Sequence, residues 1–328
     1  MKEALFYKIE NNSIKCMLCP HNCIIDKGKL GLCKVRINID NKLYSKVYFN
    51  PVSLNIDPIE KKPLYHFLPL TKTLSIGTVG CNMKCMHCQN FEISQFDNFL
   101  ENEKKEPKEI VDIAIKNKCE SISYTYNEPT IFFEYVYDIA KIAKKNNIKN
   151  VLVTNGFINK EPAKMLCEVI DAVNVDLKAF NEEFYKKICF AKLKNVKNTL
   201  KIFYENDLHL EITYLVIDKL NDDLNEIEEM CKWIKKNLNE NIPIHFSKAF
   251  PMYKMQNIIP TPTKTLIDIE KIAKKYLNYV YLGNLNNDNN IYCPNCKKLI
   301  LERFNYDKPF IKNNKCVFCN KKIFGVFS

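Results

Sequence analysis

The stretch that decides the fold is TLSIGTVGCNMKCMHCQN, which covers residues 73–90. An apolar run, 73–78, is followed by three cysteines in close succession, Cys81, Cys85 and Cys88. Three thiolates close together at the end of a strand suit an iron–sulfur cluster. Because they number three rather than four, one iron of a [4Fe–4S] cluster is left without a protein ligand. That open iron can chelate a substrate or a cofactor.

A buried amphipathic helix is the alternative explanation of this spacing, because positions i, i+4 and i+7 share one face of a helix. The residues between the cysteines count against it, since Asn82, Lys84 and His87 are polar. Gly80 precedes the first cysteine in a loop position. The cluster is therefore the better supported explanation.

The sequence around and after this motif alternates apolar, strand-like runs with helical patterns. The expected strands are 73–78, 121–126, 150–155, 172–178, 210–217, 243–248 and 279–284, and the expected helices include 107–118, 131–145, 222–238 and 263–276. Such alternation predicts a parallel sheet with helices outside it. Six or seven units are too few for a closed eight-stranded barrel. We predict an α/β fold, a partial (β/α)6-type TIM barrel, with its chemistry at the C-terminal ends of the strands.

Cysteine usage divides the chain into three zones. The 328 residues contain 15 cysteines, an odd number, and most of them fall into three tight clusters. Short spacings argue against a disulfide framework and for metal ligation. We expect a cysteine-rich N-terminal module over 1–62, the partial barrel over 63–287 and a C-terminal module over 288–328.

The C-terminal cysteines form two CxxC pairs. Cys293 and Cys296 are followed, after nineteen residues, by Cys316 and Cys319. Paired knuckles at this separation predict a zinc ribbon with four thiolate ligands. A structural zinc would fold a tail that is too short to build its own core. An iron site is the alternative, because thiolate tetrads bind both metals.

The N-terminal set comprises Cys16, Cys19, Cys23 and Cys33, with His21 as a further ligand in reach. Its spacing is compatible with zinc and with an auxiliary [4Fe–4S] cluster. We favour zinc slightly, and the iron–sulfur alternative stays open because an auxiliary cluster would carry electrons or bind substrate.

The central motif, placed after the first expected strand, resembles the CxxxCxxC signature of the radical S-adenosylmethionine (SAM) superfamily. The resemblance implies a [4Fe–4S] cluster held by Cys81, Cys85 and Cys88, with SAM bound at the open iron. It also implies SAM contacts along the barrel. The implied contact residues are His87, Gln89, Asn127, Glu128, Thr154, Asn155, Asp176, Lys178 and His245.

Three strand ends carry the rest of this resemblance. YNEP (126–129) looks like the GGEP-type motif that holds the SAM amino group, although only Glu128 and Pro129 match. VTNG (153–156) and VDLK (175–178) are similar to stretches of activating enzymes of the pyruvate formate-lyase type. In those relatives the corresponding positions touch the SAM ribose and carboxylate.

The chemistry of Asp176 and Lys178 supports the same assignment independently. They are two apart on a strand and so point to one face, where a lysine inside a barrel needs an anionic partner. The alternative is that they pair with each other. For Glu128 the alternative is a solvated loop carboxylate, for Asn155 a tight turn with the following glycine, and for His245 a packed core position.

A more specific resemblance involves DPIEKKPLYHFLP (57–69), together with the N-terminal and C-terminal cysteine motifs. It points to the AmmeMemoRadiSam system radical SAM enzymes and implies partners of the AMMECR and Memo families. The superfamily resemblance implies an enzyme that cleaves SAM reductively, with a low-potential electron donor of the flavodoxin or ferredoxin type. Its substrate is either a protein of the glycyl-radical type or a small molecule or peptide.

A zinc-ribbon nucleic-acid-binding protein, or an RNA-modifying radical SAM enzyme, is the alternative function. The net charge of +11 favours it, but Arg36 and Arg303 are the only arginines, and nucleic-acid recognition usually draws on that residue. We therefore regard nucleic acid as an unfavoured partner. The sequence lacks a run of 18 apolar residues and a signal-peptide pattern, so we expect no membrane span and a cytoplasmic location.

Overall fold

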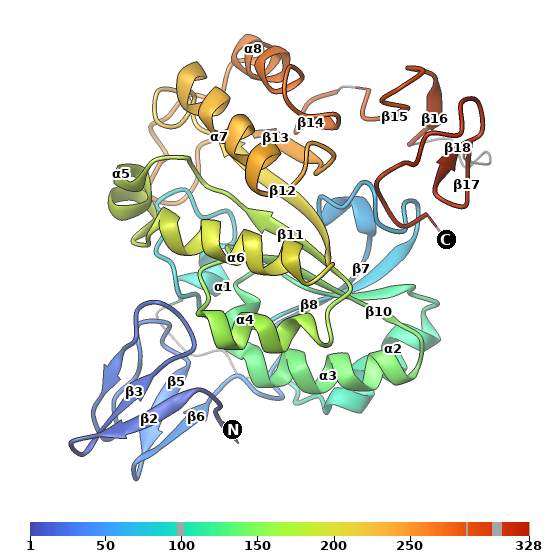
Figure 1. Cartoon of the computed structure of the whole chain (residues 1–328). Coiled ribbons are helices and arrows are strands. Elements are labelled where there is room, and N and C mark those ends of the chain that lie inside the picture. The colour runs from blue at the N-terminus through green and yellow to red at the C-terminus, as the bar shows by residue number, and fades with distance from the viewer. Residues whose placement is uncertain (97–101, 287, 304–309, 328) are drawn as a thin grey trace.

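The computed structural model describes residues 1–96, 102–286, 288–303 and 310–327. A curved sheet with helices on its outer face forms the body of the protein (Figure 1). The N-terminal hairpins and the C-terminal hairpins lie on different sides of this body. None of the helices in the described ranges is long and apolar enough to cross a membrane.

The central sheet has eight strands in simple chain order. They are β7 (Ser53–Pro58), β8 (Lys72–Gly77), β9 (Ser121–Tyr124), β10 (Lys149–Thr154), β11 (Ala172–Asp176), β12 (His209–Val216), β13 (Ile244–Lys248) and β14 (Val280–Gly283). All neighbours from β8 to β14 are parallel, whereas β7 runs antiparallel to β8. Since β7 and β14 are the two edges, the sheet stays open. The predicted α/β class with a partial parallel sheet is confirmed.

Helices connect the parallel strands. They are α1 (Phe91–Ser94), α2 (Pro107–Lys116), α3 (Phe133–Lys145), α4 (Lys160–Cys167), α5 (Glu182–Phe184), α6 (Leu193–Glu205), α7 (Leu224–Asn237) and α8 (Thr263–Ala273). The helices α3, α4, α6 and α7 lie side by side over the sheet (Figure 1). A proline at the first position begins α2, where its missing N–H is not needed.

Each of the seven expected strands overlaps an observed one, and four expected helices correspond to α2, α3, α7 and α8. The antiparallel strand β7 was not among the expected strands. Because β7 pairs with β8, the sheet begins before residue 62, where we placed the boundary of the N-terminal module. The three-zone division itself stays a prediction.

The loop between β7 and β8 closes the N-terminal end of the barrel. It begins with a short 3-10 helix, η1 (Ile59–Lys61). The side chain of Glu211, on β12, is fully buried and accepts hydrogen bonds from the backbone N of Tyr65 at 3.0 Å and of His66 at 2.7 Å. The Nε2 atoms of His209 and His245 lie 2.9 and 2.7 Å from the same carboxylate. This carboxylate therefore fixes the loop inside the barrel.

The N-terminal module consists of two small antiparallel sheets. One contains β1 (Lys2–Glu3), β6 (Lys42–Ser45) and β5 (Arg36–Ile39), and the other β2 (Tyr7–Glu10), β3 (Ser13–Cys16) and β4 (Ile24–Ile25). A buried ion pair joins the module to the barrel, with Nη2 of Arg36 2.6 Å from Oε1 of Glu134 on α3. Removing one partner of such a pair would leave an uncompensated buried charge.

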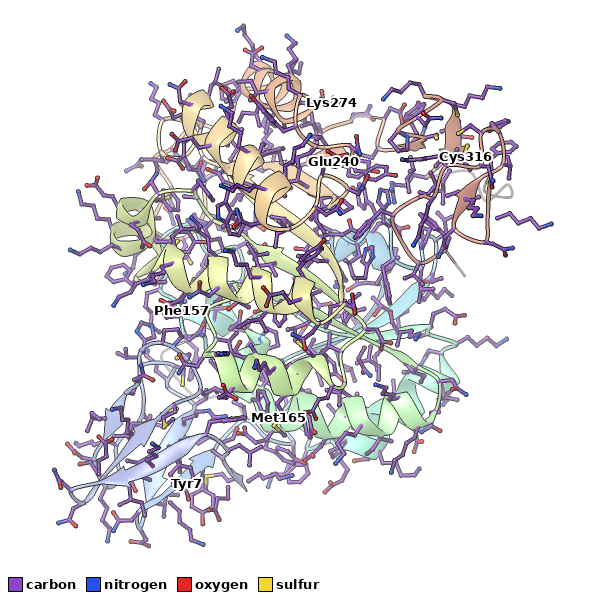
Figure 2. The ribbon with its side chains drawn as sticks, in the orientation of Figure 1. Tyr7, Phe157, Met165, Glu240, Lys274 and Cys316 are labelled. Carbon is purple, nitrogen blue, oxygen red and sulfur yellow. The ribbon has the colours of Figure 1, made fainter. Side chains whose placement is uncertain are left out.

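The C-terminal module contains two hairpins, β15 (Ile291–Tyr292) with β16 (Leu299–Leu301) and β17 (Ile311–Lys312) with β18 (Lys315–Cys316). Figure 2 labels Cys316 in this module. The chain then returns to the barrel, where the N of Val326 donates to the O of His66 at 2.7 Å and the O of Val326 accepts from the N of Leu68. The module is thus docked on the loop that closes the barrel.

Candidate functional site

A cavity of about 700 Å³ opens at the C-terminal ends of the parallel strands. Its wall contains all three cysteines of the central motif and eight of the nine residues predicted to contact SAM. These are Cys81, Cys85, Cys88, His87, Gln89, Asn127, Glu128, Thr154, Asn155, Asp176 and Lys178. The structure therefore brings together strand ends that are far apart in the sequence.

The loop that carries the cysteines is held by Asn127. Its Oδ1 accepts from the N of Thr78 at 3.1 Å, and its Nδ2 donates to the O of Gly80 at 2.9 Å. Gly80 has φ +95°, a region that favours glycine. The preceding residue of the YNEP motif, Tyr126, also has a positive φ of +69°. The left-handed turn thus forms here without either glycine of the GGEP-type motif.

The three thiols of the central motif share a protected environment. Cys85 is buried, while Cys81 and Cys88 are partly buried, and burial raises the pKa of the Cys81 and Cys88 thiols. A hydrogen bond with Cys189 and burial together raise the pKa of Cys85. Bound iron would reverse these shifts, because metal-bound thiols are deprotonated. The donor set therefore fits a thiolate-held cluster.

His87 lines the cavity with a largely buried side chain. Its ring is buried, and its Nδ1 has no hydrogen-bond partner among the residues that the structure describes. Burial, and then the charge of Lys178, lower the pKa of His87 to about 3, so the ring is neutral at pH 7. A buried polar atom without a partner is rare in native proteins.

Glu128 ties the ends of two strands together. Its Oε1 accepts from the N of Thr130 at 2.9 Å and from Oγ1 of Thr154 at 2.7 Å, and its Oε2 accepts from the N of Asn155 at 2.8 Å. Burial raises the pKa of Glu128, and these donors oppose the shift. The carboxylate is buried rather than solvated, and it orders the cavity wall at the end of β10.

Asp176 and Lys178 face the cavity together. Nζ of Lys178 donates to Oδ2 of Asp176 at 2.7 Å. Burial lowers the pKa of Lys178, but Asp176 and the nearby thiols of Cys85 and Cys189 together outweigh burial and leave the pKa raised. The lysine is therefore a firmly charged cation at the cavity wall. The mutual ion pair that we weighed as an alternative is formed, and both side chains still line the cavity.

The comparisons with known proteins agree with this geometry. The Radical SAM superfamily domain matches residues 75–234. An uncharacterized protein of Methanocaldococcus jannaschii is 41% identical to the chain, over 98% of this chain and 99% of that protein. The chain belongs to the radical SAM superfamily. This radical SAM enzyme is thus not a non-catalytic α/β core carrying zinc ribbons.

Other radical SAM relatives are more distant. A putative glycyl-radical enzyme activating enzyme of M. jannaschii is 26% identical, with 66% of this chain and 83% of that protein covered. The crystal structure of a radical SAM methyltransferase from Sphaerobacter thermophilus has a TM-score of 0.53 and 14% identity, with 66% of this chain and 67% of that chain covered. The first relates the enzyme to glycyl-radical activating enzymes, and the second shows the fold.

His245 is the one predicted SAM contact outside the cavity wall. It lies on β13 two residues before Ser247, which does line the cavity, so its side chain faces the same side of the sheet but deeper in the barrel. Its Nε2 contacts Oε2 of Glu211, and its ring packs edge-on against that of Tyr65, with the two ring centroids 4.5 Å apart. The structure therefore places His245 in the packed interior, as our alternative expectation had it.

Two features of this radical SAM site were missed in the sequence. Asp57 and Lys62 line the cavity from β7 and the loop after it, joined by a 2.8 Å hydrogen bond. Cys189 lies beside the motif, because its thiol and the ligand atoms of Cys85 and His87 are within 4.8 Å of one another. Cys189 is an isolated cysteine far from the motif in the sequence, so no sequence pattern indicated that it lies next to Cys85.

The C-terminal cysteines also gather. The thiols of Cys293, Cys296, Cys316 and Cys319 all lie within 4.8 Å of one another. Sγ of Cys293 is 3.5 Å from that of Cys319, and Sγ of Cys296 is 3.8 Å from that of Cys316. Zinc–sulfur bonds of about 2.3 Å in a tetrahedron require thiolates at such short separations. The set fits one tetrahedral metal ion, and zinc as that ion stays a prediction.

Proposed function

We propose that the enzyme binds SAM in the cavity at the strand ends, at a [4Fe–4S] cluster held by Cys81, Cys85 and Cys88. The observation that supports this proposal most strongly is the joint presence of these three thiols, Glu128 and Lys178 on one cavity wall. When bound, the cluster and SAM supply reductive cleavage of a sulfonium C–S bond and a 5′-deoxyadenosyl radical that takes a hydrogen atom from the substrate.

The chain's own residues bind and orient SAM. Lys178 offers a cation for the SAM carboxylate, while Asp176 keeps that cation charged and in place. Asn155 has its backbone N on Glu128 and its Nδ2 2.9 Å from Oδ1 of Asn82, so it is fixed beside the first cysteine. His87 also lines the cavity, with a buried and neutral ring. These contacts preorganise the site and need little rearrangement on binding.

The remaining wall of the cavity would meet the substrate. It contains polar residues, among them Lys61, Lys62 and Ser247, and apolar ones such as Ile56 and Leu215. A volume of about 700 Å³ lies within the range of small-molecule sites, which leaves room for a substrate group beside SAM. A glycyl-radical-type protein, entering by one residue, and a small molecule or peptide both fit this description.

The partners follow from the family and from resemblance. Radical SAM enzymes generally need a reductant such as flavodoxin or ferredoxin. The resemblance of 57–69 to the AmmeMemoRadiSam system proposes AMMECR-family and Memo-family proteins as further partners. Modification of RNA, and a cytoplasmic location, likewise stay predictions from the sequence.

The test is SAM cleavage under anaerobic conditions. The protein is reconstituted with iron and sulfide, reduced with dithionite and given SAM, and 5′-deoxyadenosine is measured. The control is the triple variant Cys81→Ala, Cys85→Ala, Cys88→Ala. We expect 5′-deoxyadenosine from the wild type and only background from the triple variant. Equal, background-level amounts from both proteins would refute the proposed function.

A further inference from the structure

The four N-terminal cysteines surround a second cavity, separate from the SAM cavity. Cys16, Cys19, Cys23 and Cys33 all line it, and its remaining wall is largely apolar, with residues such as Leu18 and Ile25. The free space inside this cavity is small, about 20 Å³, so the four cysteines lie close around it. Four cysteines that line one cavity with a largely apolar wall indicate a metal-binding site.

The spacing of the thiols separates this set from the C-terminal set. Among the described residues, two groups of three or more ligand atoms lie within 4.8 Å of one another, and neither contains an N-terminal cysteine. A single zinc ion at about 2.3 Å from each sulfur would draw its thiolates closer than that. A [4Fe–4S] cluster places four irons and four sulfides between its thiolates and holds them farther apart.

The central motif provides an internal comparison. Cys81, Cys85 and Cys88, which family membership assigns to a [4Fe–4S] cluster, also do not form a tight group together. In this chain, thiols assigned to a cluster are thus spread, and thiols that fit one ion are gathered. The N-terminal set follows the pattern of the cluster ligands.

Arg36 offers an unpaired hydrogen-bond donor beside the N-terminal cavity. The guanidinium of Arg36 lines the cavity and is 1% exposed. Glu134 takes both hydrogen bonds of its Nη2, but its Nε has no partner among the described residues. A cluster with four thiolate ligands carries net negative charge and offers sulfur acceptors. It would satisfy this buried N–H.

The N-terminal cavity lies directly behind the loop of the central motif. Asn82, the neighbour of Cys81, is part of its wall. Nε2 of His21 lies 2.7 Å from the backbone O of Asn82. A Cβ added to Gly80 would come within 2.6 Å of the backbone O of Cys33, so the two cysteine loops are in backbone contact. The loops that carry the two cysteine sets are thus directly adjacent.

We propose that Cys16, Cys19, Cys23 and Cys33 hold a second [4Fe–4S] cluster that relays electrons to the cluster at the central motif. This replaces the zinc that the spacing in the sequence slightly favoured. A low-potential flavodoxin or ferredoxin loses one electron to the N-terminal cluster. That electron then passes to the central cluster, which returns the N-terminal cluster to its oxidised state. No bond is made or broken and no proton moves in this relay.

Metal and sulfide analysis of the full chain tests the site independently of SAM cleavage. After reconstitution we expect about eight irons per chain in the wild type and about four irons with four sulfides in the Cys81→Ala, Cys85→Ala, Cys88→Ala variant. Adding Cys19→Ser and Cys23→Ser should remove the remaining iron. Cys293→Ser with Cys296→Ser is the matched control and should leave the iron content unchanged.

Zinc in place of iron and sulfide in the triple variant would overturn the second cluster. That result decides the question even if Cys19→Ser with Cys23→Ser fails to fold, because the triple variant leaves the N-terminal cysteines intact. If the wild type fails to cleave SAM while the triple variant still holds about four irons, the result counts against the proposed function and not against this site.

Electron paramagnetic resonance of the dithionite-reduced proteins tests the relay. Two reduced clusters in neighbouring sites interact magnetically, so we expect a wild-type spectrum that is broader than the sum of two spectra. The first of these two spectra is that of the triple variant, which holds only the N-terminal cluster. The second is that of the Cys19→Ser, Cys23→Ser variant, which holds only the central cluster. A wild-type spectrum equal to that sum would overturn the relay, because the clusters would then be too far apart to interact.

Discussion

At the scale of single residues, the site is made of side chains that already hold one another. Glu128 accepts three hydrogen bonds, from Thr130, Thr154 and Asn155, and Asp176 pairs with Lys178. Such mutual support keeps binding groups in place before the ligand arrives and reduces the entropy lost on binding. The positive charge of Lys178 at the cavity wall can then be tested by mutation.

Lys178→Met should weaken SAM binding by roughly 10- to 100-fold. The methionine keeps most of the side-chain volume but removes the cation that we assign to the SAM carboxylate, and a hydrogen bond to a charged group contributes about 1.5–3 kcal/mol. Equilibrium dialysis of the reconstituted protein with labelled SAM measures the effect. Lys164→Met, on the exposed face of α4, is the matched control and should bind as the wild type does. Unchanged affinity for Lys178→Met would remove this lysine from the SAM site.

Cys85→Ala and Cys189→Ala form a second pair of variants at this scale. Their thiols lie within 4.8 Å of each other, yet the motif assigns only Cys85 to the cluster. We expect Cys85→Ala to abolish 5′-deoxyadenosine formation and Cys189→Ala to retain the central cluster. Iron quantification and the assay distinguish the two. Loss of about four irons in Cys189→Ala would show that the ligand set is misassigned.

The sequence could predict candidate site residues that lie at strand ends. It could not predict how deep in the barrel a residue lies, or which residues far apart in the sequence come into contact. Glu128, Asp176 and Lys178 were predicted because each lies at a strand end, where parallel strands converge. His245 lies on the expected face of β13, but how far it sits from the strand end depends on the register between strands. Cys189 approaches Cys85 only through the packing of the segment after β11, and no local pattern encodes that contact.

At the scale of elements, the loop between β7 and β8 connects the barrel to the C-terminal module. His66 is fully buried in it, with Nδ1 2.7 Å from the O of Phe324 and Nε2 2.6 Å from Oη of Tyr281. A neutral ring can donate from Nδ1 to the carbonyl and accept at Nε2 from the hydroxyl. Both ring nitrogens are thus satisfied without a positive charge.

His66→Phe should lower the free energy of unfolding by about 2–4 kcal/mol, because it leaves the Phe324 carbonyl and the Tyr281 hydroxyl buried without partners. Urea unfolding, followed by fluorescence, measures the change. Tyr292→Phe removes an exposed hydroxyl and should leave the stability almost unchanged. Equal stability of His66→Phe and the wild type would show that these hydrogen bonds hold nothing in place.

The same histidine predicts a pH dependence. Burial lowers the pKa of His66 to about 3, below its ordinary value near 6.5. Below about pH 6.5 the unfolded chain binds a proton at His66 and the folded chain does not, so stability falls as the pH drops from about 6.5 toward 3. In His66→Phe this fall should be shallower than in the wild type. If the urea midpoint falls by the same amount in both proteins between about pH 7.5 and 5.5, His66 is not the group that causes the pH dependence.

The C-terminal hairpins give the second prediction at this scale. We expect about one zinc per chain, lost in Cys293→Ser, Cys316→Ser, because two of four thiolates cannot hold a structural site. Without zinc, 310–327 would detach from His66, and limited proteolysis should cleave there while the barrel stays intact. Zinc retained by the double variant would refute this site, and a matched Cys231→Ser change should leave the zinc content as it is.

Elements were predictable where burial leaves a continuous apolar run. The parallel strands β8 to β13 are covered on both faces and read as such runs. The edge strand β7 exposes Asn55 and Ile56 and contains Ser53, Asn55 and Asp57, so its pattern resembles a polar loop. Its pairing with β8 is a long-range contact that a local pattern does not reveal.

At the scale of the whole molecule, three cysteine sets occupy three different structural settings. The central set lines the cavity at the strand ends of the barrel. The N-terminal set lines a second cavity that also includes Asn82 of the central motif, and the C-terminal set lies in the docked hairpins. Only the C-terminal set gathers its thiols around one point. Under our proposals, the three sets are a reactive centre, a route for electrons and a structural support.

The central claim is that SAM binds the open iron of a cluster held by Cys81, Cys85 and Cys88. Electron paramagnetic resonance of the reduced protein with and without SAM, followed by electron–nuclear double resonance with SAM carrying ¹⁵N in its amino group, tests it most directly. We predict that SAM changes the cluster signal and that the label adds a nitrogen coupling. Both effects should be absent from the Cys81→Ala, Cys85→Ala, Cys88→Ala variant. The resonance signal of its N-terminal cluster should not change when SAM is added. A wild-type signal that SAM leaves unchanged, with no ¹⁵N coupling, would contradict the claim.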